Sequence, residues 1–149
     1  MSAPVVLVLS GRNLNLLGTR EPAVYGTSTL DDYVRAVTDS AGVHGFEIEH
    51  VQSSHEADLV DAVHGGIGRV AGIVINPGAF THYAWAIHDA LAAFTGPVIE
   101  LHISNPARRE SWRHTSVITP VATGTITGFG IAGYRLALDA MASLLGDGS

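Results

Sequence analysis

Two residues able to exchange a proton, Glu100 and His102, are separated by one position in the segment Glu-Leu-His-Ile-Ser-Asn at 100–105. If this segment is a strand, alternation places both side chains on one face, with Ser104 beyond them. A carboxylate beside an imidazole fixes its tautomer and raises its proton affinity, as a general acid requires. The alternatives are a structural pair, or a Ser-His-Glu hydrolase triad, for which the usual Gly-x-Ser-x-Gly turn is missing.

A second reactive pair, Arg20 and Tyr25, lies in the long segment after the apolar run at 5–9. Connections between a strand and a helix usually span about 2–6 residues, and longer ones are typical of active-site lids. We therefore expect a lid near 18–28, with Gly18 and Gly26 as hinges. A neighbouring guanidinium stabilises a phenolate electrostatically, which would make Tyr25 a base. A loop tyrosine taken alone is more often a packing residue.

Polar side chains also follow the apolar run at 72–75. Asn76 is expected at the end of a strand, where Pro77-Gly78 forces a sharp exit, and Thr81 is expected to cap the next helix. His82 then lies at the rim of a crevice, whereas Asn76 has the alternative role of satisfying the turn backbone. Asp89 is expected two helical turns beyond His82, about 10 Å away, as a surface charge or a residue serving a neighbouring subunit.

Arg109 and Arg113 are spaced to share one helical face, where forked donors would grip a carboxylate or hydroxyls. The alternative is a solvated basic helix. The eight histidines lack a metal-binding spacing such as His-Glu-x-x-His, so no metal is expected.

Composition excludes several chemistries. There is no cysteine, and all eight basic residues are arginine, so thiolate nucleophiles and lysine Schiff bases are impossible. The net charge of −6 argues against nucleic-acid binding and favours a small-molecule partner. Without an apolar run of about 20 residues or a basic leader, we expect no membrane association and a cytoplasmic location.

Apolar runs alternate with helical patterns, which predicts one α/β domain over 1–149. Strands are expected at 5–9, 47–52, 72–76, 97–103 and, more weakly, 117–121. Helices are expected around 30–41, 60–67 and 131–145, with Ser53 to Glu56 as a capping box for the second. The pattern favours a flavodoxin-like doubly wound sandwich with a five-stranded parallel sheet, whose ligand site lies at the carboxyl ends of the strands.

These signals, in order and spacing, resemble the type II 3-dehydroquinate dehydratases. The matching motifs are Asn-Leu-Asn-Leu-Leu-Gly at 13–18, Arg-Glu-Pro at 20–22, Tyr-Gly at 25–26, Gln-Ser at 52–53, His-Glu at 55–56, Asn-Pro-Gly-Ala at 76–79, Thr-His at 81–82, Glu-x-His at 100–102, Ser-Asn at 104–105 and Arg-Glu at 109–110. The resemblance runs from the first strand to Gly133-Tyr134.

The resemblance implies an anti elimination of water from 3-dehydroquinate through an enolate, without cofactor, metal or Schiff base. Tyr25, supported by Arg20, would be the base, and Asn13 would hold a water that stabilises the enolate. His102, oriented by Glu100, would be the acid. The residues implied in substrate binding are Asn76, His82, Arg113, Ile103 and Ser104, the last two through their backbone amides.

The resemblance also implies a dodecamer built from trimers, in which Asp89 reaches a neighbour's site. A role in aromatic biosynthesis by the shikimate pathway and a role in quinate breakdown both stay open. Five positions depart from the usual family pattern: Arg12, Ser54, Ala107, Arg108 and Ser111. Two alternatives remain, namely a flavodoxin-like binding module without turnover and an enzyme specialised for a quinate analogue.

Overall fold

The computed structural model describes residues 2–19 and 21–146. Its centre is a sheet of parallel strands in the order β2-β1-β3-β4-β5. The strands are β1 (Val5–Arg12), β2 (Glu47–Gln52), β3 (Gly72–Gly78), β4 (Val98–His102) and β5 (Gly124–Thr127). This is the order of flavodoxin-like folds, as predicted.

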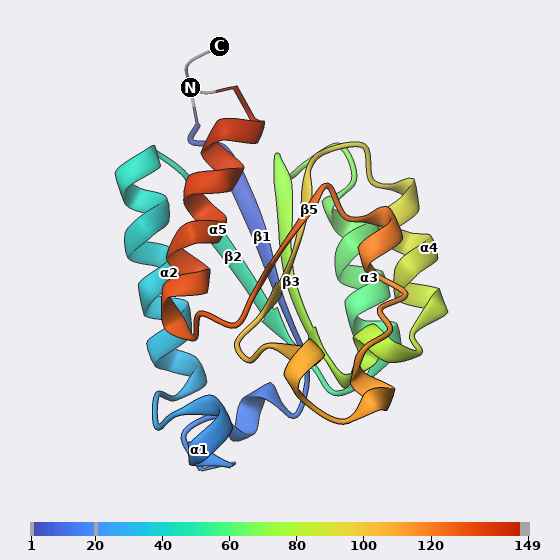
Figure 1. The fold of residues 1–149 in the computed structure, drawn as a ribbon. Helices are drawn as coiled ribbons and strands as arrows, with labels where there is room; N and C mark the ends of the chain where they lie inside the picture. The colour runs from blue at the N-terminus through green and yellow to red at the C-terminus, as the bar shows by residue number, and fades with distance from the viewer. Residues whose placement is uncertain (1, 20, 147–149) are drawn as a thin grey trace.

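Helices cover both faces of the sheet (Figure 1). On one face α2 (Leu30–His44) packs beside α5 (Ile131–Leu144), and on the other α3 (Glu56–Gly66) packs beside α4 (Trp85–Ala93). The short α1 (Pro22–Tyr25) lies beyond the carboxyl end of β1. The predicted doubly wound architecture is therefore confirmed. Within residues 2–19 and 21–146, no helix has both the length and the apolar character needed to cross a membrane.

The β1 strand shows why its sequence is apolar throughout. Val6 and Val8 pack into the core beneath α2 and α5, while Leu7 and Leu9 pack into the core beneath α3 and α4. All four side chains are buried, so neither face of this central strand tolerates a polar residue. Burial of each contributes roughly 1.5–3 kcal/mol, which fixes the strand that leads into the site.

The carboxyl ends of β1 and β3 approach each other closely. Ser10 pairs with Asn76, and Arg12 pairs with Gly78. A Cβ atom at Gly11 would lie 2.0 Å from the carbonyl oxygen of Pro77, so only glycine permits this approach. The close pairing brings the polar segments that follow the two strands to the same edge of the sheet.

The predicted strand at 117–121 is wrong. Val117 and Ile118 are buried in the core beneath α3 and α4, and Thr119–Val121 forms a single 3-10 turn containing Pro120. The fifth strand is β5, which pairs with β4 and has few apolar residues because it lies at the edge of the sheet. The apolar pattern therefore marked a core segment and missed the edge strand.

The predicted capping box at Ser53 to Glu56 is also wrong. The N-cap of α3 is His55, which makes no side-chain cap hydrogen bond. The Ser53 hydroxyl instead accepts from the backbone N–H of His55 at 3.0 Å and donates to Asp58 at 2.7 Å. A complete capping box occurs at α2, between Thr29 and Asp32.

Candidate active site

A cleft opens at the carboxyl ends of β1, β3 and β4, and it brings together most of the residues predicted from the sequence. The predicted residues that line it are Asn13, Tyr25, Asn76, His82, His102, Ile103, Ser104 and Arg113. Glu100 contacts His102 without lining the cleft. Arg20 lies outside the described residues.

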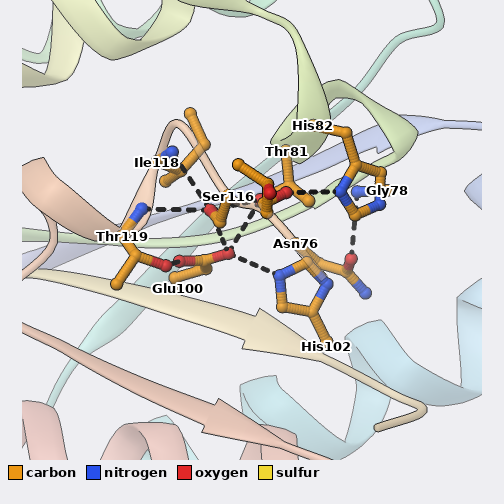
Figure 2. A network of polar contacts seen from close by, with 10 residues as sticks. Asn76, Gly78, Thr81, His82, Glu100, His102, Ser116, Ile118 and Thr119 are labelled. Atoms are coloured by element: carbon orange, nitrogen blue, oxygen red, sulfur yellow. Dashed lines mark hydrogen bonds and ion pairs between the residues drawn. The ribbon is translucent and has the colours of Figure 1, made fainter. Parts of the chain in front are cut away.

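Glu100 and His102 are neighbours on one face of β4, as alternation predicts. The Oε2 atom of Glu100 lies 2.6 Å from Nε2 of His102 (Figure 2), and both side chains are buried. Burial raises the pKa of Glu100, but hydrogen bonds and the charge of His102, with hydroxyl donors, outweigh it and lower the pKa to about 2. An ionised carboxylate only accepts hydrogen bonds, so Nε2 of His102 holds the shared proton.

Three hydroxyl groups surround the carboxylate of Glu100 (Figure 2). Thr81 donates to Oε2 at 2.7 Å, Ser116 donates to Oε2 at 2.9 Å, and Thr119 donates to Oε1 at 2.5 Å. The predicted role of Thr81 as a helix cap is wrong, because it lies in a 3-10 turn and α4 is capped by Ala84. Sequence reasoning missed Ser116 and Thr119, which follow the loop after β4 and belong to no motif.

Tyr25 meets a guanidinium group in the same cleft. Nη1 of Arg109 donates to the Tyr25 hydroxyl at 2.6 Å and to Ser104 Oγ at 3.3 Å. The guanidinium carbon also lies 5.2 Å from the centre of the Tyr25 ring. From the sequence, Arg109 was expected only to bind a ligand together with Arg113, and its contact with Tyr25 was missed. The pair of arginines at 108–109 was the signal that could have pointed to this contact.

Asn13 enters the cleft with an unusual backbone conformation. Its φ of 69° is in the left-handed region, and it stands at the start of the 3-10 turn Leu14–Leu16. The backbone N–H of Asn13 donates to Ser54 Oγ at 3.3 Å. Asparagine tolerates this region better than most residues, and the contact with Ser54 anchors it there.

Asn76 is buried, and its side-chain amide makes two hydrogen bonds. Its Nδ2 donates to the Tyr134 hydroxyl at 3.0 Å, and its Oδ1 accepts from the Gly78 N–H at 3.3 Å. The turn role that the sequence left open is thus present, and the same side chain lines the cleft. Burial raises the pKa of Tyr134 well above its ordinary value, so that its hydroxyl stays neutral.

Trp112 lies between His82 and Arg113 at the rim of the cleft and contacts both side chains. The His82 ring lies edge-on to Trp112 at 5.2 Å, and the Arg113 guanidinium carbon lies 3.9 Å from the centre of the Trp112 ring. Nδ1 of His82 lies 2.7 Å from the Thr115 carbonyl oxygen, which only accepts, so Nδ1 holds the proton. Burial chiefly lowers the pKa of His82, which favours the neutral ring.

Two spacing predictions are wrong. Arg109 and Arg113 do not share a helical face, because Pro106–Arg108 and Ser111–Arg113 form separate 3-10 turns. His82 and Asp89 do not share a helix either, since His82 lies in the turn Ala79–His82 and α4 begins at Trp85. Asp89 is exposed on α4 and does not line the cleft.

In the part of the chain that the structure describes, no three histidine, aspartate or glutamate side chains gather closely enough to hold a metal ion. The groups in the cleft are those of acid–base chemistry: a phenol beside a guanidinium and an imidazole beside a carboxylate. Two side chains that are chemically able to exchange a proton, Tyr25 and His102, therefore line a single cleft.

Residues 4–142 match the family described as Dehydroquinase class II. The chain belongs to this family. The proteins that it is similar to include 3-dehydroquinate dehydratase 2 of Pseudomonas putida, 54% identical over 95% of both chains. The 3-dehydroquinate dehydratase of Bacillus licheniformis is 53% identical over 91% of this chain and 93% of its own length.

Solved class II dehydroquinases share the fold closely. The crystal structure of the type II dehydroquinase from Propionibacterium acnes matches with a TM-score of 0.91 at 43% identity, covering 95% of this chain and 98% of that one. A 3-dehydroquinate dehydratase-like protein from Bifidobacterium longum is more distant, with a TM-score of 0.72 at 35% identity over 95% of this chain and 98% of that one.

The five positions expected to depart from the family's usual pattern do not themselves line the cleft. Arg12 donates to the Tyr83 hydroxyl at 3.1 Å, and its guanidinium carbon lies 5.3 Å from the centre of the Phe80 ring. Ser54 anchors Asn13. The remaining departures are exposed in the segment after β4: Ala107, Arg108 and Ser111.

Proposed function

We propose that this protein converts 3-dehydroquinate to 3-dehydroshikimate and water by acid–base elimination. The observation that carries the proposal is that Tyr25, beside Arg109, and His102, beside Glu100, line the same cleft. Removal of a proton α to a ketone followed by loss of a β-hydroxyl needs one base, one acid and support for the enolate. Membership of the family supports this substrate.

Tyr25 is the base in this proposal. The positive charge of Arg109, 2.6 Å from the phenol oxygen, favours the phenolate form. The phenolate takes the proton next to the C3 ketone, and the electron pair of the C–H bond moves to the ketone oxygen as an enolate. Asn13 holds a water molecule that stabilises the enolate oxygen. Arg20, outside the described residues, supports Tyr25.

His102 is the acid. The enolate electrons form the new C=C bond while the C1–O bond breaks, and imidazolium gives its proton to the departing hydroxyl, which leaves as water. Because Nε2 faces Glu100, the opposite ring nitrogen, Nδ1, supplies this proton. The base and the acid act on opposite faces of the ring, which gives anti elimination. Every step uses a side chain of this protein, so the proposal invokes no metal, cofactor or Schiff base.

Binding is assigned to the remaining cleft residues. The backbone amides of Ile103 and Ser104, with the Ser104 hydroxyl, bind the substrate carboxylate. Asn76, His82 and Arg113 bind the ring hydroxyls. Two features support this: Asn76 is held rigidly by Tyr134 and Gly78, and the bond from Nδ1 of His82 to Thr115 leaves Nε2 of that ring as an acceptor.

The segment 18–28 is proposed to close over the bound substrate as a lid. Gly18 and Gly26, with φ of 93° and 75°, flank the turn that presents Tyr25. Glycine is favoured at both positions because this backbone region is strained for other residues.

A dodecamer built from trimers is proposed as the assembly, with Asp89 contributing to a neighbour's site. The exposure of Asp89 on α4, away from its own cleft, supports this role. Light scattering on the purified protein should give a mass of about twelve chains. A monomer that turns over substrate at full rate would overturn both the assembly and the role of Asp89.

The test of the proposed reaction is the rise of enone absorbance in the ultraviolet when purified, metal-chelated protein meets 3-dehydroquinate. The expected result is turnover by the parent protein and a loss of at least about 100-fold in Tyr25→Phe. Tyr83→Phe, a matched change at an exposed tyrosine outside the cleft, should keep the parent rate. Binding without turnover in the parent would overturn the proposal and favour a binding module.

A further inference from the structure

The carboxylate of Glu100 receives more hydrogen bonds than the orientation of His102 requires. Besides Nε2 of His102, it accepts from Thr81, Ser116 and Thr119, which come from the segments after β3 and β4. Glu100 itself is 2% exposed, so these contacts replace solvent around a buried charge. We call the three hydroxyl residues the Glu100 shell.

The direction of the hydroxyl protons in the Glu100 shell follows from the number of donors and acceptors around Ser116. Ser116 Oγ accepts from the backbone N–H groups of Ile118 and Thr119, both at 3.1 Å, which occupies its two lone pairs (Figure 2). Its own proton must then go to Glu100 Oε2 at 2.9 Å or to Thr81 Oγ1 at 2.8 Å. Ser116 is therefore fixed as a donor.

Thr81 continues the same direction. Because Ser116 cannot accept from it, Thr81 gives its proton to Oε2 of Glu100 at 2.7 Å. Thr119 donates to the other oxygen, Oε1. The Thr81 and Thr119 protons thus point toward Glu100, the Ser116 proton goes to Glu100 or to Thr81, and the carboxylate is placed as an acceptor on both oxygens.

We propose that Thr81, Ser116 and Thr119 are positioning residues that act through Glu100 to set the acid strength and ring orientation of His102. This inference rests on the proposed function, in which His102 is the acid. Hydrogen bonds spread the negative charge of the carboxylate and weaken its hold on the shared proton. The Nε2 proton therefore stays on the ring, and the imidazolium remains a ready donor at Nδ1.

A network that only stabilised the fold would not need its hydrogen bonds to converge on the carboxylate that contacts His102. Removal of one hydroxyl from the Glu100 shell leaves a more basic carboxylate, which holds the His102 proton more tightly. The imidazolium becomes a weaker acid that stays protonated to higher pH. The prediction is therefore a change in rate and pH dependence with little change in substrate affinity, because no shell residue is proposed to touch substrate.

The first test uses Ser116→Ala and Thr119→Val, with Thr119→Ser as the conservative variant. The two deletions should lower kcat about three- to tenfold, leave KM within about twofold, and move the alkaline limb of the kcat profile to higher pH. Thr119→Ser should restore the parent profile. The matched control is Thr123→Val, which removes a hydroxyl that accepts from Val98 N–H at 3.0 Å and does not touch Glu100.

A second test asks whether the effect passes through Glu100. In a Glu100→Gln background, adding Thr119→Val should change kcat by less than about twofold, because the charge on which the Glu100 shell acts is gone. Equal losses in both backgrounds would overturn the proposal. So would folded Ser116→Ala and Thr119→Val proteins with parent kcat and an unchanged pH profile.

A third measurement keeps this inference separate from the proposed reaction. If the parent protein does not turn over 3-dehydroquinate, the proposed function fails, and nuclear magnetic resonance of ¹⁵N-labelled histidine still tests the Glu100 shell. The ring titration of His102 should move to higher pH in Thr119→Val and not in Thr123→Val. Superimposable titrations of the parent and Thr119→Val would overturn the inference whatever the reaction.

Discussion

The Tyr25 hydroxyl lies 2.6 Å from Nη1 of Arg109, although the two residues are 84 positions apart in the chain. This contact links the segment after β1 to the segment after β4. It places the positive charge of Arg109 against the hydroxyl of Tyr25, the proposed base. The guanidinium carbon also lies 5.2 Å from the centre of the Tyr25 ring, and this packing holds the guanidinium in place. Opening of the proposed lid must break this contact or carry both segments together.

Arg109→Gln should reduce kcat/KM by about 100-fold or more, because the phenolate loses its charged partner. Arg109→Lys keeps the charge without the forked donors that reach both Tyr25 and Ser104, so it should fall between the parent and Arg109→Gln. The control is Arg108→Gln, a neighbouring exposed arginine. A rate for Arg109→Gln within about threefold of the parent would contradict the role of Arg109.

Ser54→Ala should lower kcat about three- to tenfold, because Asn13 loses the hydroxyl that accepts its backbone N–H at 3.3 Å. Without this anchor, the left-handed conformation of Asn13 at φ 69° competes with more favourable ones. Ser54→Asn supplies another acceptor and should stay close to the parent. Steady-state kinetics on the three proteins decides, and equal kcat in all of them would show that Ser54 does not position Asn13.

Glu100 should make stability depend on pH at the acid end. Its folded-state pKa of about 2 lies below the ordinary value of 4.5, so its contribution is complete above about pH 4.5 and is lost as the pH falls through about 2. The size of this contribution is about 3 kcal/mol. Urea unfolding of the parent and Glu100→Gln should give a difference that shrinks over this range. A difference independent of pH would contradict the assignment.

Tyr134→Phe should destabilise the fold by about 1–3 kcal/mol, because it leaves Nδ2 of Asn76 buried without its partner. The high pKa that burial gives Tyr134 means that this loss should be constant across neutral pH. Urea unfolding measures it, with Tyr83→Phe as an exposed control expected within about 0.5 kcal/mol of the parent. A Tyr134→Phe protein as stable as the parent would show that Asn76 finds another partner.

Local spacing was enough to predict the parts of the molecule that depend on nearby residues. The apolar run beginning at Val5 marked a central strand because both of its faces are buried. The single residue between Glu100 and His102 placed both on one face of β4 because strands alternate. The doubly wound fold followed from the alternation of such strands with helices.

Other features depend on contacts that spacing does not encode. Arg109 reaches Tyr25, and Thr119 reaches Glu100, only because separate loops fold onto the same edge of the sheet. Thr81 was expected to cap a helix, yet a buried carboxylate is a stronger partner for its hydroxyl than a helix N-terminus. The strand expected at 117–121 was wrong because a buried core segment is apolar even when it is not a strand. The edge strand β5, by contrast, has few apolar residues and so gave no such signal.

The most direct test of the central claim, a Tyr25 base and a His102 acid in one cleft, is proton exchange in deuterated water. With 3-dehydroquinate followed by nuclear magnetic resonance, His102→Ala should still exchange the proton beside the ketone faster than the protein-free control, while forming almost no enone. Tyr25→Phe should neither exchange that proton nor form enone. Exchange at the parent rate in Tyr25→Phe, or enone formation at the parent rate in His102→Ala, would contradict the assignment of base and acid.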